Sequence, residues 1–266
     1  MQIITGLVLA ALIGIAAWRA GALSASGFWA ALMVGGLLYG LGGFPWAALL
    51  LTFFVSSSAL SRLFPRQKGL LVEKFAKGTR RDWGQVLANG GLGAALVVLQ
   101  ALFPGRSEPW LAFVGAMAAV NADTWATELG VLSPTPPRLI TSGRPVERGA
   151  SGGVSQAGYL AALAGSLLVG AVAAVFTPEL KAGWLLVGAA AAGVLGSSFD
   201  SYLGATLQAI YRCSTCRKET ERHPTHTCGG ETIQVRGLAW LNNDWVNLAC
   251  SLAGALTMLA LELGSS

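Results

Sequence analysis

Charged residues are scarce in this chain of 266 residues: 12% are Asp, Glu, Lys or Arg, whereas 53% are hydrophobic. A soluble domain carries about 25% charged residues, so the composition excludes an ordinary soluble enzyme. Segments that lack Lys and Arg, each about 16 to 25 residues long, indicate about eight membrane-spanning helices. Because these are continuous apolar runs rather than short alternating ones, they also exclude an outer-membrane barrel.

We therefore expect an all-α fold, a polytopic integral membrane helical bundle that forms a single transmembrane domain over residues 1–266. No Lys or Arg precedes the first apolar run. A cleaved secretory signal carries basic residues there, so this run is expected to be a span as well. The expected spans lie near residues 2–17, 26–42, 44–60, 84–103, 110–130, 154–176, 182–207 and 237–261.

Basic residues are nearly missing from every second loop. Of the 18 Lys and Arg residues, only Arg106 and Lys181 fall outside the first, third, fifth and seventh loops. Cytoplasmic loops hold the excess of Lys and Arg, so we expect these four loops in the cytoplasm and both termini outside a prokaryotic cell membrane. The three long loops are a basic loop (61–83), a glycine-rich loop (131–153) and a Cys/His loop (208–236). Anionic headgroups explain the net charge of +5, so we expect contact with membrane lipids and none with nucleic acid.

The expected spans contain no Lys or Arg, yet three of them contain acids. Asp123 and Glu128 lie in the fifth span, Asp200 in the seventh and Asp244 in the eighth. An ionisable side chain in hydrocarbon is costly and is usually retained for function. An ion pair within the spans is excluded, so loops, protons or metal ions must supply the counter-charge. The alternative is that isolated polar side chains simply hold helices together.

Helical spacing indicates which polar residues converge. Residues three, four or seven apart share a face of a helix. In each of the three acid-bearing spans, polar residues recur at this spacing, so each span has one polar face. We expect these faces to line one cavity that opens to the cytoplasm. Carboxylate and amide oxygens without His or Cys are the ligands that suit Mg²⁺. The residues concerned are Asn121, Thr124 and Glu128; Ser197, Asp200, Ser201, Gly204 and Gln208; and Asn243, Asp244 and Asn247.

Two loops next to these spans carry groups that suit phosphate. Lys77, Arg81 and Asp82 lead directly into a helix with Gln85 and Asn89. Ammonium and guanidinium groups at a membrane surface bind phosphate, although an ordinary positive-inside loop is the alternative. The glycine-rich loop adds small residues before a helix, whose N–H groups can hold a phosphate. Its candidates are Arg138, Thr141, Gly152, Gly153 and Ser155.

Cysteine is rare: the chain has four, and three of them share one loop. Cys213 and Cys216 are separated by two residues, and His226 and Cys228 follow. Three cysteines and one histidine at this spacing predict a structural Zn²⁺ site. A disulfide is less favoured in a reducing cytoplasm, and a redox or incidental pair remains the alternative. The spacing leaves open whether His223 or His226 is the ligand.

Glycine, by contrast, is abundant, with 35 residues that mostly fall inside the expected spans. Small residues let helix backbones approach closely inside a membrane, where the hydrophobic effect cannot drive helices together. We therefore expect most of these glycines to serve helix packing.

Six ordered motifs give the chain a resemblance to a known family. It resembles the plant phytyl-phosphate kinases and the wider membrane family of transmembrane protein nineteen with its prokaryotic relatives, over nearly the whole chain. The motifs are Arg81-Asp82-x-x-Gln85-Val-Leu-Ala-Asn89-Gly, Asn121-Ala-Asp123-Thr124-x-x-x-Glu128, Pro137-Arg138-x-x-Thr141, Gly152-Gly153-x-Ser155, Asp200-Ser201-x-x-Gly204-x-x-x-Gln208 and Asn242-Asn243-Asp244-x-x-Asn247.

The resemblance implies a Mg²⁺-dependent kinase that transfers the terminal phosphoryl group of a nucleoside triphosphate, preferentially CTP, to an isoprenoid monophosphate such as phytyl phosphate. Phosphoryl transfer requires positioning and charge neutralisation more than a strong base. Asp123, Asp200 and Asp244 would be Mg²⁺ ligands with support from Glu128. Lys77, Arg81 and Arg138 would hold phosphates. The remaining expected substrate contacts are Asp82, Gln85, Asn89, Asn121, Thr124, Thr141, Gly152, Gly153, Ser155, Ser201, Gln208, Asn242, Asn243 and Asn247.

Two other functions fit the same residues. A cytidylyltransferase would use the same CTP, acids and membrane setting, and would give a CDP-lipid. A transporter or ion exchanger would also bury acids in glycine-rich helices. The lack of a convincing inverted repeat and the clustering of polar groups near the basic loops favour the kinase over the transporter.

Overall fold

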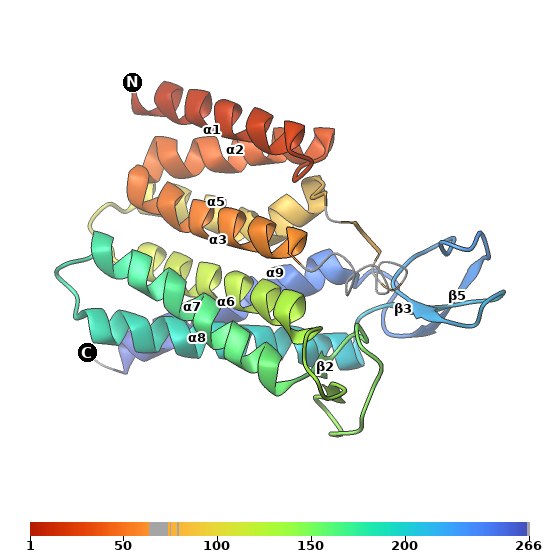
Figure 1. Cartoon of the computed structure of the whole chain (residues 1–266). Coiled ribbons are helices and arrows are strands. Elements are labelled where there is room, and N and C mark those ends of the chain that lie inside the picture. Colours follow the sequence, from red (N-terminus) through yellow and green to blue (C-terminus); the bar gives the residue numbers. More distant parts are fainter. Residues whose placement is uncertain (64–73, 75, 79, 265–266) are drawn as a thin grey trace.

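The computed structural model describes residues 1–63, 74, 76–78 and 80–264, so part of the expected basic loop 61–83 lies outside the described residues. Long helices dominate the described chain and run roughly parallel or antiparallel to one another (Figure 1). They are α1 (Gln2–Arg19), α2 (Ala25–Gly42), α3 (Phe44–Arg62), α5 (Trp83–Leu102), α6 (Glu108–Gly130), α7 (Gln156–Phe176), α8 (Ala182–Thr206) and α9 (Asn243–Leu263). The expected helical bundle is confirmed.

Seven of these helices are long and apolar enough to cross a membrane, and α6 is not among them. Helix α6 is the longest but one, with 23 residues, and it packs against α3, α5, α7, α8 and α9. Its residues from Leu111 to Ala122 are all buried. The lower hydropathy of α6 therefore reflects polar side chains that face the interior of the bundle, such as Asn121 and Asp123, rather than lipid.

Glycine allows the central helices to approach closely. A Cβ on Gly115 of α6 would lie 2.4 Å from the carbonyl oxygen of Gly254 in α9. The reverse holds too, because a Cβ on Gly254 would lie 2.4 Å from the carbonyl oxygen of Gly115. Two helices with Cβ atoms here would have to move apart, as expected for small residues at a membrane helix interface.

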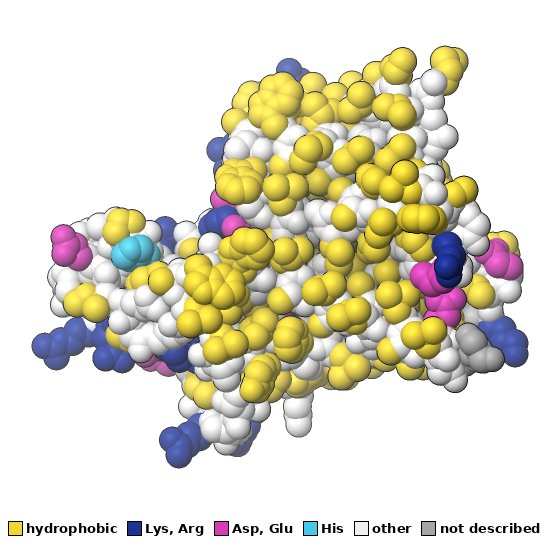
Figure 2. Space-filling model, turned by 180° about the vertical axis from the view of Figure 1, so that it is seen from behind, with side chains coloured by type: hydrophobic (Ala, Val, Ile, Leu, Met, Phe, Trp, Pro, Cys, Tyr) yellow, Lys and Arg dark blue, Asp and Glu magenta, His cyan; other side chains and the backbone are white. Residues whose placement is uncertain are grey.

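Both termini lie at the same end of the bundle, and the strands lie at the opposite end (Figure 1). The described residues of the loops after α1, α3, α6 and α8 are therefore at the strand end, together with most of the described basic residues. Hydrophobic side chains cover the helical body, while many Lys and Arg side chains gather at the strand end (Figure 2). An apolar belt of this kind is what a lipid-facing surface requires.

Two small antiparallel sheets, which the sequence pattern does not predict, order the loops at this end. In the glycine-rich loop, β1 (Arg138–Leu139) pairs with β2 (Gly153–Val154). In the Cys/His loop, β3 (Ile210–Cys213) pairs with both β4 (Glu219–Thr220) and β5 (Thr232–Arg236).

Two helix ends differ from the expectation. Helix α9 begins at Asn243 rather than near residue 237, because the Asn242 side chain accepts the backbone N–H groups of Asp244 and Trp245 as an N-cap. Helix α8 ends at Thr206, so Gln208 lies just beyond the helical stripe that was expected to include it.

Candidate functional site

Most of the expected site residues line one cavity of about 670 Å³ at the strand end of the bundle. Helices α5, α6, α7, α8 and α9 form its walls, and the loops before α5, α7 and α9 form its mouth. The expected residues found in its lining are Lys77, Arg81, Gln85, Asn89, Asp123, Thr124, Glu128, Gly152, Gly153, Ser155, Asp200, Ser201, Gln208, Asn242, Asn243, Asp244 and Asn247.

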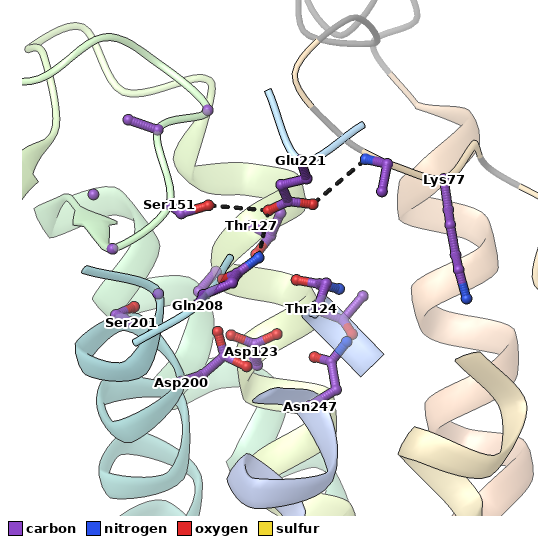
Figure 3. A pocket seen from close by; sticks show the side chains of 18 of the residues that line it. Lys77, Asp123, Thr124, Thr127, Ser151, Asp200, Ser201, Gln208, Glu221 and Asn247 are labelled. Carbon is purple, nitrogen blue, oxygen red and sulfur yellow. Dashed lines mark hydrogen bonds between the residues drawn. The ribbon is translucent and has the colours of Figure 1, made fainter. Parts of the chain in front are cut away.

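Asp123 of α6 and Asp200 of α8 face each other deep in the cavity (Figure 3). Among the residues that the structure describes, neither carboxylate forms an ion pair with Lys or Arg. Asp200 Oδ2 is buried and accepts no hydrogen bond within the described part of the chain. Thr124 and Asn247 place further oxygen atoms beside the pair (Figure 3). Two adjacent, half-buried carboxylates repel each other unless a proton or a cation lies between them, and this donor set suits a hard divalent ion.

Asp244, by contrast, has a cationic partner from a loop. Lys77 Nζ lies 2.5 Å from Asp244 Oδ2 and 2.9 Å from the Asp82 carboxylate. Burial lowers the pKa of Lys77, but hydrogen bonds to Asp244 and Asp82 outweigh it and raise that pKa. Asp244 Oδ1 remains buried with no hydrogen-bond partner among the described residues, so one oxygen is still available to a ligand. A Cβ on Gly84 would lie 2.4 Å from Asp244 Oδ2, so only glycine leaves room for this pair.

Arg81 is anchored beside the cavity mouth by the end of α3. Its guanidinium donates hydrogen bonds of 2.9 Å to the hydroxyls of Ser57 and Ser58, and it lies 5.3 Å from the ring centres of Phe53 and Phe54. Burial lowers the pKa of Arg81 to about 10, although the charge of Glu128 opposes this shift. The guanidinium is still charged near neutral pH and gives the mouth a fixed positive charge.

The glycine-rich loop presses against the end of α8. Gly152 has a φ of +81°, and a Cβ there would lie 2.5 Å from the Cβ of Ala205. Ser155 caps α7 by accepting the backbone N–H of Gly158 at 3.1 Å. The N-terminus of α7 therefore opens into the cavity, which favours an anion there.

Glu221, just after β4, ties the loops together over the cavity. Its carboxylate accepts hydrogen bonds from the Ser151 hydroxyl at 3.0 Å, the Gln208 amide at 2.8 Å and the Ala76 backbone N–H at 3.4 Å (Figure 3). The Glu221 backbone N–H also donates to the carbonyl of Lys74 at 2.8 Å. Burial raises the pKa of Glu221, although these donors oppose the shift.

A Cys/His cluster, made of Cys213, Cys216, His226 and Cys228, lies in the β3–β5 segment. One ligand atom from each residue falls within 4.8 Å of every other. The backbone N–H groups of Cys216 and Thr215 bond the Cys213 thiol and lower its pKa to about 7. His223 is not part of the cluster; its ring stacks on Tyr211 with the centres 4.6 Å apart.

Comparison with known proteins agrees with this architecture. The family described as integral membrane protein DUF92 matches residues 8–255. The chain belongs to this DUF92 family. No solved structure matches it.

Three relatives of this DUF92 chain come from distant organisms. Protein PGR of Arabidopsis thaliana is 34% identical over 283 residues, which cover 97% of this chain and 96% of the relative. A membrane protein of Methanocaldococcus jannaschii is 33% identical over 62% of this chain and 66% of its own length. Another from Synechocystis is 32% identical over 63% of this chain and 68% of its own length.

Four residues expected to contact substrate in this DUF92 chain lie outside the cavity lining. Asn121 is fully buried and bonded to Ser56 and to the carbonyl of Gly165, so it joins helices. Asp82 caps α5 in a capping box with Gln85. Arg138 is exposed and donates to the carbonyl of Gly143, and Thr141 is exposed too, so the structure does not bring either residue to the cavity.

Other cavity residues escaped the sequence reasoning. Glu221, Arg148, Arg222 and Tyr211 all line the cavity. Arg148 also donates to the carbonyl of Ser133 at 2.6 Å, which fixes it at the cavity edge. Spacing rules for helices do not reach these residues, because loops and a small sheet bring them to the site.

Proposed function

We propose that this integral membrane protein is an isoprenoid-monophosphate kinase, of the phytyl-phosphate type, that uses CTP or another nucleoside triphosphate. The observation that carries the proposal is the Asp123–Asp200 pair, which has no cationic partner among the described residues and lies in a cavity that cations also line. Lys77, Arg81 and Arg148 supply positive charge at the rim. Acids below and cations above are what a Mg²⁺–triphosphate needs for charge balance.

The reaction makes modest demands on the protein. An oxygen of the acceptor phosphate forms a bond to the γ-phosphorus, the bond from that phosphorus to its bridging oxygen breaks, and the nucleoside diphosphate leaves. The acceptor is already anionic, so no general base is required. Asp123 and Asp200 would hold Mg²⁺ in the cavity that Asp244 also lines, and the metal would neutralise charge on the phosphates.

The lipid tail of the acceptor requires a path from the bilayer to the cavity. Tyr159 of α7 lines the cavity and is 37% exposed. Its hydroxyl lies 3.4 Å from the hydroxyl of Ser198 on α8. An isoprenoid chain that lies along the α7–α8 face would bring its phosphate to the N-terminus of α7 without leaving the membrane.

The decisive experiment follows the label from nucleotide to lipid. Purified protein in detergent is incubated with Mg²⁺, phytyl or geranylgeranyl phosphate, and CTP or ATP labelled at either the α- or the γ-phosphorus. We expect γ label in the lipid, and none with an Asp200→Asn variant. Lipid that carries the α label would overturn the kinase in favour of a cytidylyltransferase. No transfer with any combination would overturn both and favour a transporter.

A further inference from the structure

The Cys/His segment has almost no apolar core of its own. Between Ile210 and Arg236 the buried hydrophobic residues are Ile210, Tyr211 and Cys213, and in β5 only Thr232 is buried. A segment this small that buries so little apolar surface needs a disulfide or a metal to stay folded.

The distances within the Cys/His cluster fit one metal ion. The sulfurs of Cys213 and Cys228 are 3.5 Å apart, and Nδ1 of His226 lies 3.5 Å from the sulfur of Cys216 and 3.2 Å from that of Cys228. Tetrahedral Zn²⁺ with Zn–S bonds of about 2.3 Å places its sulfurs about 3.8 Å apart. The four donors, all within 4.8 Å of one another, are therefore close enough together to share one such ion.

The cluster is not a disulfide. All of the cysteines are free, and the 3.5 Å between Cys213 and Cys228 far exceeds an S–S bond of about 2.05 Å. The backbone N–H of Cys228 donates to Nδ1 of His226 at 3.4 Å, so Nδ1 is the unprotonated ring nitrogen, and it lies on the side of the sulfurs. An unprotonated Nδ1 within 3.5 Å of the Cys216 and Cys228 sulfurs is placed as a metal ligand would be.

We propose that Cys213, Cys216, His226 and Cys228 bind one Zn²⁺, and that this metal holds Glu221 in place over the cavity. Glu221 stands in the chain between the first two ligands and the last two. The paired strands β3 and β4 join Cys213 to the residues before Glu221, with the Cys213 N–H donating to the carbonyl of Lys218 at 3.0 Å. The metal would thus fix the strand that delivers Glu221.

Through Glu221 the metal would order the cavity mouth. The Glu221 carboxylate joins Ser151 of the glycine-rich loop, Gln208 after α8 and Ala76 before α5. Loss of the metal would free the strand and then these three contacts. The Zn²⁺ has no open position for chemistry, because all four ligands come from the protein.

Metal analysis of the purified full-length protein tests the site. We expect about one zinc per chain by mass spectrometry of the metal, and loss of nearly all of it in Cys213→Ser and Cys228→Ser variants. Two matched controls, Cys250→Ser in α9 and His223→Ala, should keep their zinc. Replacement by Co²⁺ should give thiolate-to-cobalt absorption bands. Wild-type protein without zinc, or zinc retained in both cysteine variants, would overturn the site.

Hydrogen exchange on the same samples tests the role of the metal without any activity assay. After chelation, amides of residues 213–231 and of the loop 149–153 should both exchange faster, whereas α6 should stay protected. Protection of α6 also shows that the bundle remains folded. If 213–231 loosens and 149–153 does not, the metal does not order the cavity mouth. Neither readout depends on whether the protein is a kinase.

Discussion

In the cavity, Asp123 and Asp200 lie next to each other. Among the described residues neither has a Lys or Arg partner, so no cationic side chain offsets the repulsion between the two carboxylates. Their repulsion destabilises the metal-free protein. An Asp200→Asn variant should therefore melt higher than wild type without Mg²⁺, by about 2–4 °C, the shift that about 1 kcal/mol gives in a chain of this size. The same variant should lose transfer activity by about 100-fold or more.

Thermal melts with and without Mg²⁺ measure both sides of this prediction. Wild type should gain stability as Mg²⁺ binds, and Asp200→Asn should gain little. Glu179→Gln, which changes an exposed acid in the α7–α8 loop, is the matched control and should behave as wild type. An Asp200→Asn variant that melts lower than wild type and still responds to Mg²⁺ would show that the pair is not the metal site.

Asp82 lies outside the cavity lining and contacts the start of α5. It caps the helix by accepting the Gln85 backbone N–H at 3.0 Å. Burial raises the pKa of Asp82, but the N–H of Gln85 and the ammonium of Lys77 outweigh it, so the pKa falls below its ordinary value of 3.8. Asp82→Ala should cost about 1 kcal/mol, the usual price of a lost N-cap.

The sign of the pH dependence follows from the lowered pKa of Asp82. A carboxylate with a lowered pKa stabilises the fold above its unfolded value and loses that effect as pH falls through its folded value. The difference in melting temperature between wild type and Asp82→Ala should stay constant from pH 8 to about 5 and shrink below about 4. Asp82→Asn keeps a capping oxygen and should cost less. A gap that widens in acid would contradict this role.

At the scale of helices, the contact between α6 and α9 depends on glycine. A Cβ on Gly254 would lie 2.4 Å from the Gly115 carbonyl oxygen and 2.5 Å from the Ala119 Cβ. Gly254→Ala should thus destabilise the protein by about 1–3 kcal/mol, the usual cost of overpacking, and displace Asp244 from the cavity. Thermal unfolding in detergent measures the loss.

A glycine that packs loosely provides the control. The Cβ of a Gly91→Ala variant in α5 would have its closest contact at 3.8 Å, with the Leu87 side chain. Because alanine favours a helix over glycine, this variant should be as stable as wild type or slightly more so. Equal losses for Gly91→Ala and Gly254→Ala would mean that helix approach is not what Gly254 provides.

The helices could be predicted from sequence because one signal, the absence of Lys and Arg over a membrane's thickness, marks each of them. The acids of the cavity could be predicted in the same way, because a carboxylate within a long apolar run is easily recognised as unusual. Asn121 was expected in the cavity but joins helices instead of lining it, because a buried amide that joins helices has the same spacing as one that faces a cavity. Glu221 could not be found at all, because its partners Ser151 and Ala76 lie 70 and 145 residues away.

For the whole molecule, the loops after α1, α3, α6 and α8 share one end, as do both termini with the loop between α7 and α8 (Figure 1). The excess of basic residues predicts that the first end is cytoplasmic. In intact cells a maleimide that cannot cross the membrane should label Glu179→Cys and should fail to label Ser142→Cys. Both positions are exposed, so labelling depends on the side of the membrane and not on burial.

Permeabilised cells complete the topology test, because Ser142→Cys should then react as well. Wild type is the background control: Cys250 is buried, and the other cysteines lie at the expected cytoplasmic end. The opposite result, with Ser142→Cys labelled in intact cells, would place the cavity mouth outside. A nucleoside triphosphate is held in the cytoplasm, so that single outcome would also remove the proposed phosphoryl donor from reach of Asp123 and Asp200.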